Sequence, residues 1–221
     1  AMSGLLKLAR FDNGDLDSQR YAIIALTNVA ANRATHEALI ESGVVRLMST
    51  LLMADDVEVR NAAVHGIANF AAAPENHRML IEEGCLPSII KLAACGDMEA
   101  QRRAVAAIRG LAVDANIRVE IVQAGGLTPL LKLTHCEDVS VQQEVLSALC
   151  NLSLCGCIGD NHMRFVEEVS IRSLVTFLCS ADATYRLFGA VTLGNIAADL
   201  TQGDDMVDQG ALSPLIAVSN A

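Results

Sequence analysis

The stretch D-V-S-V-Q-Q-E-V-L-S-A-L-C-N-L-S, residues 138–153, decides the fold, because the rest of the chain repeats it. Its signature is an Asn within an apolar run, and matching runs put the marked position at 28, 69, 110, 151 and 195. These positions are 41, 41, 41 and 44 residues apart. A nearly fixed step of this length is typical of stacked helical repeats, none of which buries its apolar face alone.

Each marked position lies in a long amphipathic helix. With about 100° of rotation per residue, positions −6, −5, −2, +1 and +2 from the marked residue fall on one side and are small or apolar in all five runs. This side is expected to pack inside the stack. The marked residue points the opposite way, and in a curved stack that second face is expected to line a continuous groove.

The marked residue is an asparagine in four of the five runs, as Asn28, Asn69, Asn151 and Asn195. An amide side chain offers two hydrogen-bond donors and an acceptor. Spaced along a groove, such amides are suited to hold the main chain of an extended peptide, whatever its side chains. The alternative is that each Asn bonds only its own neighbours or water. Four Asn residues at one helical phase favour contact with a ligand.

Composition and charge limit the possible functions. The 221 residues are 52% hydrophobic but only 3% aromatic, without Trp, which suits thin helical layers packed with aliphatic side chains. The net charge of −10 argues against sequence-independent nucleic-acid binding and against direct binding to anionic membranes. No membrane span or secretory signal is visible. Seven cysteines at scattered spacings indicate a reducing compartment, the cytoplasm or the nucleus.

Recurrent turn and cap residues divide each repeat into a short helix, a middle helix and a long third helix. An Asp stands thirteen residues before every marked position, where a carboxylate caps free N–H groups. Four glycines at one phase end the short helices, whereas the fourth unit has Val169 there, so its turn should differ. The third helices are expected near 15–31, 56–72, 97–113, 138–154 and 182–198, in a single domain spanning 1–221.

With these features, the chain resembles the armadillo repeat family over almost its whole length. The matching pieces are A-L-C-N-L-S (148–153), G-G-L-T-P-L-L-K-L (125–133), G-A-L-S-P-L-I (210–216) and N-H-R-M-L-I-E-E-G (76–84). The sequence of these segments is most similar to that of adaptor-type and catenin-like members. The resemblance implies an all-α, right-handed superhelix of three-helix repeats whose third helices line a concave groove. Members of the family bind extended segments of partner proteins there and act as scaffolds, adaptors or transport receptors, not as enzymes.

The resemblance also assigns the groove asparagines to the four positions named above, and the Gly at position 110 departs from the pattern. Import receptors of the family place Trp one turn before each Asn. The residues at those positions here are Ile24, His65, Ala106, Ser147 and Val191, which argues against recognition of a basic import signal.

The groove row predicts which other side chains reach a peptide. Candidate specificity residues are Tyr21, His65, Arg103, Glu144, Ser147 and Phe188. Asp17, Glu58, Glu99 and Glu144 against Arg103 favour a basic or mixed peptide, although acidic residues in a first helical turn also interact with the helix dipole. Arg103, which clusters with Arg102 and Arg109, is either an anchor for an acidic or phosphorylated residue or a partner of Glu99, Asp97 or a neighbouring repeat. Phe188 is either an exposed groove aromatic or a residue tucked under last units that this sequence lacks.

No catalytic grouping or cofactor motif emerges, so no enzyme activity and no cofactor are expected. Cys155, Cys157 and His162, near Cys150, are a poor match to structural zinc spacing, so no metal is predicted. The sequence therefore predicts a protein-interaction scaffold with an extended peptide as its partner. The alternative is a solenoid that self-associates through its ends, because the chain begins and stops within a repeat and is otherwise expected to be a fragment of a longer protein.

Overall fold

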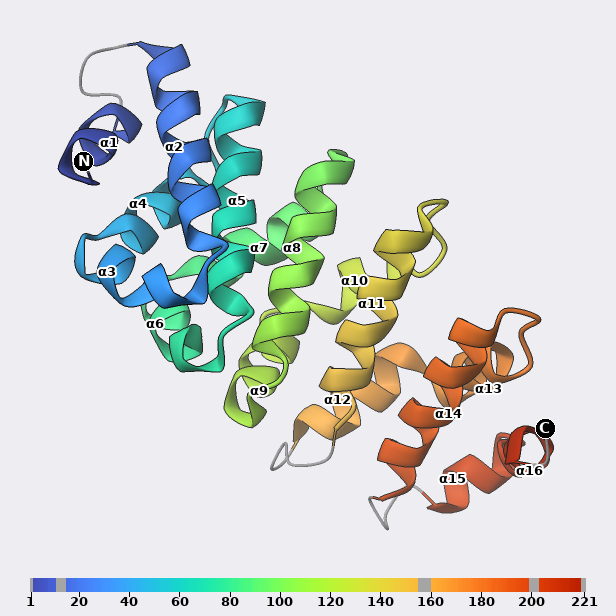
Figure 1. The fold of residues 1–221 in the computed structure, drawn as a ribbon. Coiled ribbons are helices and arrows are strands. Elements are labelled where there is room, and N and C mark those ends of the chain that lie inside the picture. Colours follow the sequence, from blue (N-terminus) through green and yellow to red (C-terminus); the bar gives the residue numbers. More distant parts are fainter. Residues whose placement is uncertain (1, 11–14, 155–159, 199–202, 220–221) are drawn as a thin grey trace. The chain divides into compact units, whose positions relative to one another are not determined.

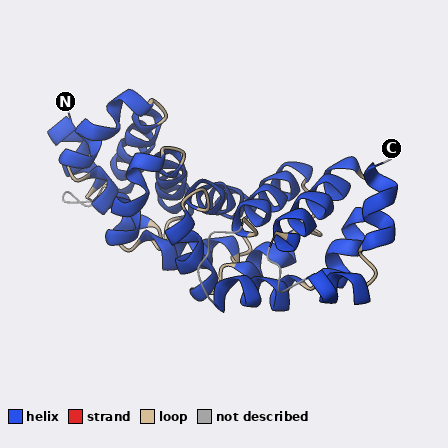
Figure 2. Ribbon diagram, turned by 90° about the horizontal axis from the view of Figure 1, so that it is seen from below, coloured by secondary structure: helices blue, strands red, loops and turns tan. Residues whose placement is uncertain are grey.

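The computed structural model describes residues 2–10, 15–154, 160–198 and 203–219, and its chain trace is shown in Figure 1. Every regular element within these residues is a helix (Figure 2). The contacts divide the chain into two compact units, Ala1–Leu111 and Ala112–Ala221. The expectation of a single domain stays a prediction.

The first unit contains three long third helices, α2 (Leu16–Ala30), α5 (Val57–Ala71) and α8 (Met98–Leu111). In Figure 1, α5 lies between α2 and α8 and contacts both. The shorter helices of this unit are α1 (Met2–Ala9), η1 (Arg33–Thr35), α3 (His36–Glu41), α4 (Val44–Leu51), η2 (Pro74–Asn76), α6 (His77–Glu82) and α7 (Cys85–Ala93).

The second unit contains two long third helices in contact with each other, α11 (Val139–Leu152) and α14 (Ala183–Ala197). Its shorter helices are α9 (Ala115–Gln123), α10 (Leu127–Leu133), α12 (Asp160–Val169), α13 (Ile171–Leu178), α15 (Gly203–Asp208) and α16 (Leu212–Ser219). All five third helices of the chain lie within the ranges that the repeat step predicts.

The predicted Asp caps hold the start of every third helix. The carboxylate of Asp56 accepts a hydrogen bond from the N–H of Val59 at 3.0 Å, and that of Asp138 accepts from the N–H of Ser140 at 2.8 Å. Asp15, Asp97 and Asp182 accept equivalent bonds from the first turns of α2, α8 and α14. A cap of this kind contributes about 0.5–2 kcal/mol to helix stability. The repeated Asp therefore fixes where the third helix of each repeat begins.

The turn between the short and the middle helix uses a left-handed residue. The predicted glycines adopt φ of 78° at Gly43, 71° at Gly84, 79° at Gly125 and 80° at Gly210. In the fourth unit the left-handed residue is Ser170, with φ of 59°, one residue after Val169. The expected difference in that turn is therefore confirmed, and it leaves a non-glycine residue in a conformation that favours glycine.

The apolar side of the third helices forms the core. The positions predicted to face inward are buried in α5, α8 and α11 and in most of α2 and α14. The exceptions are Val29, Ala190 and Ala197, which belong to the first and the last of the five helices. Small side chains at the inward-facing positions let neighbouring helix backbones approach closely, which fills the core without large aromatic side chains.

Buried polar side chains connect three of the short helices, α3, α6 and α9, to the preceding third helix. His36 Nε2 lies 2.8 Å from the Ala30 carbonyl oxygen, and His77 Nε2 lies 2.8 Å from that of Ala71. Arg118, at the same phase, donates from Nη1 to the Ala112 carbonyl at 3.2 Å. Each side chain thus satisfies a carbonyl at a helix C-terminus, which otherwise lacks an intrahelical partner.

Candidate functional site

The candidate site is the face of the third helices that carries the marked asparagines, called here the asparagine face. It consists of the marked residue and the residues 4, 7 and 11 positions before it. In the first unit, Asn28 and Tyr21 on α2 are exposed, and the Tyr21 side chain is 74% exposed. His65 and Asn69 on α5 and Arg103 on α8 are half-buried. These predicted site residues therefore lie on one set of adjacent helices and reach solvent.

Two of the marked asparagines, Asn69 and Asn195, bond residues of the preceding third helix or its C-cap. Asn69 Nδ2 donates to the Thr27 carbonyl oxygen at 3.1 Å, and Asn195 Nδ2 donates to Ser153 Oγ at 2.9 Å. Bonding to neighbouring residues is thus confirmed for Asn69 and Asn195, and Asn195 Nδ2 also donates to the Cys150 carbonyl oxygen at 3.4 Å. An amide carries a second N–H and an acceptor oxygen, so the Asn69 side chain retains groups for a ligand. Asn28 forms no side-chain hydrogen bond to the described residues.

Gly110 interrupts the asparagines for a steric reason. A Cβ atom at this position would lie 2.4 Å from the carbonyl oxygen of Ala71 and 2.9 Å from its carbonyl carbon. Both atoms belong to the backbone of α5, which cannot move aside as a flexible side chain does. The close approach of α5 and α8 therefore excludes any side chain at position 110, and with it a ligand-binding amide.

Arg20 is a site residue that the sequence interpretation missed. Its Nη2 lies 2.5 Å from Asp56 Oδ2, and its guanidinium also pairs with Asp17 and Glu58 at 3.3 and 3.7 Å. The hydrogen bond from Arg20 lowers the pKa of Asp56 to about 2. Asn61, one repeat later at the same phase, donates to the next capping carboxylate, Asp97, at 3.1 Å. The recurrence of this phase, eight residues before the marked position, was the available signal.

Arg103 is paired within its own helix. Arg102 and Arg103 both donate to the carboxylate of Glu99, in each case at 2.8 Å. Burial works to raise the pKa of Glu99, but the hydrogen bonds from both arginines outweigh it and lower that pKa. Burial lowers the pKa of the neighbouring His65, and the positive charge of Arg103 adds to the effect. His65 is therefore held toward its neutral form next to a cluster of one positive net charge.

In the second unit, α11 and α14 enclose a hollow of about 480 Å³ on their asparagine face. This α11–α14 hollow is lined by Gln143, Leu146, Ser147, Cys150, Asn151, Thr184, Leu187, Phe188 and Val191. The predicted site residues Ser147, Asn151 and Phe188 are thus brought together. Glu144, also predicted, is half-buried on α11 beside them.

The interpretation of Phe188 as an exposed groove aromatic is wrong. Its side chain is only 2% exposed, and its ring lies 5.4 Å from that of Phe177 on α13 in an edge-to-face arrangement. Phe177 also contacts Tyr185, whose hydroxyl donates to the Thr134 carbonyl. These aromatic contacts hold Phe188 as the floor of the α11–α14 hollow, where only part of its ring is accessible.

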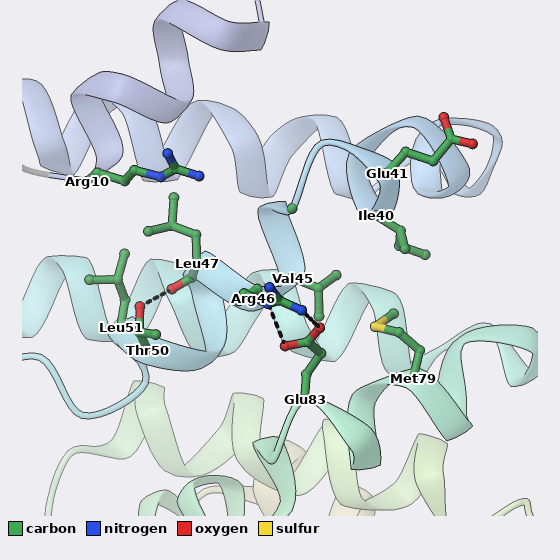
Figure 3. Close-up of a pocket in the computed structure, with 11 residues that line it drawn as sticks. Arg10, Ile40, Glu41, Val45, Arg46, Leu47, Thr50, Leu51, Met79 and Glu83 are labelled. Carbon is green, nitrogen blue, oxygen red and sulfur yellow. Dashed lines mark hydrogen bonds and ion pairs between the residues drawn. The ribbon is translucent and has the colours of Figure 1, made fainter.

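Another hollow, of about 560 Å³, lies in the first unit away from the third helices (Figure 3). Its lining residues lie on α3, α4 and α6 or directly beside the ends of α1, α4 and α6. The Arg46 guanidinium pairs with the Glu83 carboxylate there at 3.2 Å, as Figure 3 shows. Arg10 and Glu41 also line the hollow, so its charged groups are not limited to this pair.

The remaining sequence features are the cysteines near His162 and the question of a membrane span. Cys155 and Cys157 lie outside the described residues, and the side chain of His162 is not described. Across the described part of the chain, no cluster of three or more metal-binding side chains occurs, and the five cysteines described there are free thiols. None of the helices within the same residues has the length and hydrophobicity needed to cross a membrane.

Comparison with known proteins finds one matching repeat model and several similar solved structures. Residues 114–154 match the model of the armadillo/beta-catenin-like repeat. The designed armadillo repeat protein YIII(Dq)4CqI matches with 25% identity and a TM-score of 0.88, over 100% of this chain and 93% of that chain. A set of computationally designed armadillo repeat proteins for modular peptide recognition matches with 26% identity and a TM-score of 0.87, over 98% and 92% of the two chains.

A third similar structure is the designed armadillo repeat protein YIII(Dq.V1)4CPAF in complex with peptide (KR)4. It is 25% identical, with a TM-score of 0.84, over 96% of this chain and 90% of that chain. No curated protein sequence matches the chain. The repeat match and these structural similarities confirm the resemblance to the armadillo repeat family and the armadillo repeat fold.

Proposed function

We propose that this protein is a non-enzymatic scaffold that binds an extended segment of a partner protein on the asparagine face of its third helices. The observation that carries the proposal is the placement of Asn28 and Asn69 on adjacent helices with their amides at the surface. Spaced amides recognise main-chain N–H and C=O groups, which every extended peptide presents at regular intervals. The complex of a similar designed protein with the peptide (KR)4 supports a peptide ligand for this fold.

The proposal extends to the setting in which such a scaffold works. Five described cysteines remain free thiols, which supports a reducing compartment such as the cytoplasm. An adaptor role of the catenin-like kind fits the same surface, because it requires only capture of a partner segment. The exposed Tyr21 next to Asn28 supplies a large side chain of the type that dominates binding energy at protein interfaces.

The test is a selection of binders from random twelve-residue peptides, followed by affinity measurements on Asn28→Ala. Asn28 forms no side-chain hydrogen bond to the described residues, so its loss should leave folding intact. We expect affinity to fall by about fivefold to tenfold, the effect of one or two hydrogen bonds. Asn116→Ala, an exposed asparagine on α9, is the matched control and should bind normally. Equal affinity of both variants would contradict the proposal.

The second candidate function is self-association, favoured by exposed apolar side chains on α15 and α16. Val207, Leu212 and Ile216 are each more than half exposed, and clustered apolar surface of this kind marks interaction sites. Sedimentation equilibrium over a wide concentration range tests this candidate. A strict monomer at high concentration would remove it, whereas dimers dispersed by Leu212→Glu would support it.

A further inference from the structure

The α11–α14 hollow differs in chemistry from the rest of the asparagine face. Of its nine lining residues, none carries a charge at neutral pH. In the first unit, the same face carries Asp17, Glu58, Glu99 and the arginines that pair with them. Burial raises the pKa of the Cys150 thiol, so this lining residue also stays neutral.

The residue eight positions before the marked position differs in chemistry between the third helices. Eight residues before the marked position, α2 carries Arg20 and α5 carries Asn61, and both bond the capping carboxylate of the next repeat. Helix α14 carries Leu187 at this position, and its side chain is 66% exposed. At the same phase, the lining of the hollow includes the polar Gln143 of α11 and the exposed aliphatic Leu187 of α14.

The hollow has a firm floor and one accessible apolar wall. Phe188 is fixed by its edge-to-face contact with Phe177, and Leu146 is buried beside it. Leu187 and Val191 stand one turn apart on α14, and Val191 is 40% exposed. A volume of about 480 Å³ falls in the range of roughly 300–1,000 Å³ that is typical of pockets for small organic groups.

Polar groups at the hollow suit a main chain passing over it. Asn151 and Ser147 come from α11, and Thr184 comes from α14. The Ser147 hydroxyl donates to the Gln143 carbonyl at 2.8 Å, which leaves its oxygen lone pairs as an acceptor for a peptide N–H. An apolar depression with a polar margin is the arrangement that receives a side chain while the adjoining backbone remains hydrogen-bonded.

We propose that the α11–α14 hollow is a specificity pocket that takes one aliphatic or aromatic side chain of the bound segment. The inference rests on the proposed function, because the occupant belongs to an extended peptide bound on the asparagine face of the second unit. The absence of charge among the lining residues, set against the charged face of the first unit, selects an apolar occupant. The partner is therefore a protein segment with a Leu-, Ile-, Met- or Phe-like residue at one fixed place.

The test uses the twelve-residue peptides selected against the wild-type protein. We expect them to share one large apolar residue, and its replacement by Ala should weaken binding by about tenfold or more. Leu187→Glu should cause a similar loss, because it places a charge in the pocket, while its exposure keeps the fold intact. In the double change, the two losses should not add, since both remove the same contact.

A matched control and three outcomes keep this inference separate from the proposed function. Val139→Glu alters an exposed apolar residue at the start of α11 that does not line the hollow, and it should bind normally. Failure to select any peptide would overturn both the function and the pocket. Peptides that depend on Asn28 but bind Leu187→Glu normally would overturn the pocket alone. Dimers of the wild-type protein that Leu187→Glu disperses would identify a second copy as the occupant and overturn it as well.

Discussion

At the scale of the residue, the neighbouring helix decides what a side chain does. Tyr21 and Phe188 hold the same phase in their repeats, seven residues before the marked position, yet one is 74% exposed and the other 2%. Asn69 and Asn28 likewise share a phase, but only Asn69 has a carbonyl of a preceding third helix within reach. The helical phase of a residue predicts the direction of its side chain, but it does not predict which residues of neighbouring helices the side chain contacts.

Gly110→Ala should destabilise the first unit. The added methyl group would meet the Ala71 carbonyl oxygen, and overpacking against backbone costs about 1–3 kcal/mol, more than the gain in helix propensity. Urea denaturation followed by circular dichroism measures the change in unfolding free energy. Gly194→Ala is the control, because nothing lies within 4 Å of a Cβ there, and it should be neutral or stabilising. A Gly110→Ala protein as stable as the wild type would contradict the steric explanation.

The Arg20–Asp56 pair predicts a specific acid dependence. The pKa of Asp56 falls from 3.8 to about 2 in the folded protein, so its contribution to stability is complete above about pH 4. That contribution is lost as the pH falls from about 4 to 2, because the unfolded chain then binds the proton more readily. Asp56→Asn keeps a good N-cap and should flatten the stability profile in this window.

Arg20→Gln provides the companion variant for this pH measurement. It removes the donor that lowers the pKa of Asp56 and should flatten the same part of the profile. The double variant should add little to either single change. An acid profile that both substitutions leave unchanged would show that the pair does not contribute to folding.

At the scale of the element, the third helices combine two tasks. Their caps and apolar sides build each repeat, and their amides connect one repeat to the next. Asn69 and Asn195 therefore have a structural role in addition to the binding role that we propose for the asparagine face. A substitution at Asn69 changes stability and affinity together, and a loss of binding in such a variant does not by itself identify a ligand contact.

Asn69→Ala should be less stable than Asn28→Ala. The first substitution removes the hydrogen bond to the Thr27 carbonyl, whose net contribution is about 0.5–1.5 kcal/mol. The second removes an exposed amide without a described side-chain partner and should leave stability within measurement error. Parallel urea titrations compare the two. Equal stability of both variants would contradict a structural role for the Asn69 amide.

The period, caps and turns were predictable from the sequence, because each depends on local chemistry. The capping aspartates lie where the 41-residue step places them, and the left-handed glycines follow the same step. The site was only partly predictable. The repeat phase selected Asn28, His65 and Asn69, but the burial of Phe188 depends on Phe177 of another helix. The pairing of Arg103 with Glu99 was foreseen only as one of two alternatives.

At the scale of the whole molecule, charge and repeat chemistry set which peptides are favoured. The net charge is −10, and Asp17 and Glu58 stand on the asparagine face of the first unit with Arg20 as a shared counterion. The second unit offers the uncharged α11–α14 hollow. Under the proposed function, the first unit favours a basic segment and the second unit favours a segment with one apolar residue.

A basic peptide should bind more weakly as salt is added. Exposed charges are screened over about 10 Å at 0.1 M ionic strength, and the acidic side chains on α2 and α5 are exposed. Affinity for a selected peptide should fall when the ionic strength rises from about 0.05 M to about 0.5 M. Fluorescence anisotropy measures this dependence. Affinity that stays constant over the range would contradict the electrostatic part of the account.

The most direct measurement tests whether the asparagine face binds the main chain of an extended peptide. A selected peptide is synthesised with a single N-methylated amide at each position in turn, which removes one N–H group and leaves the side chains in place. The account predicts that methylation at one position weakens binding to the wild type by about tenfold but has little further effect on Asn28→Ala. Uniform affinity across the methylated series, or equal losses with both proteins at every position, would contradict it.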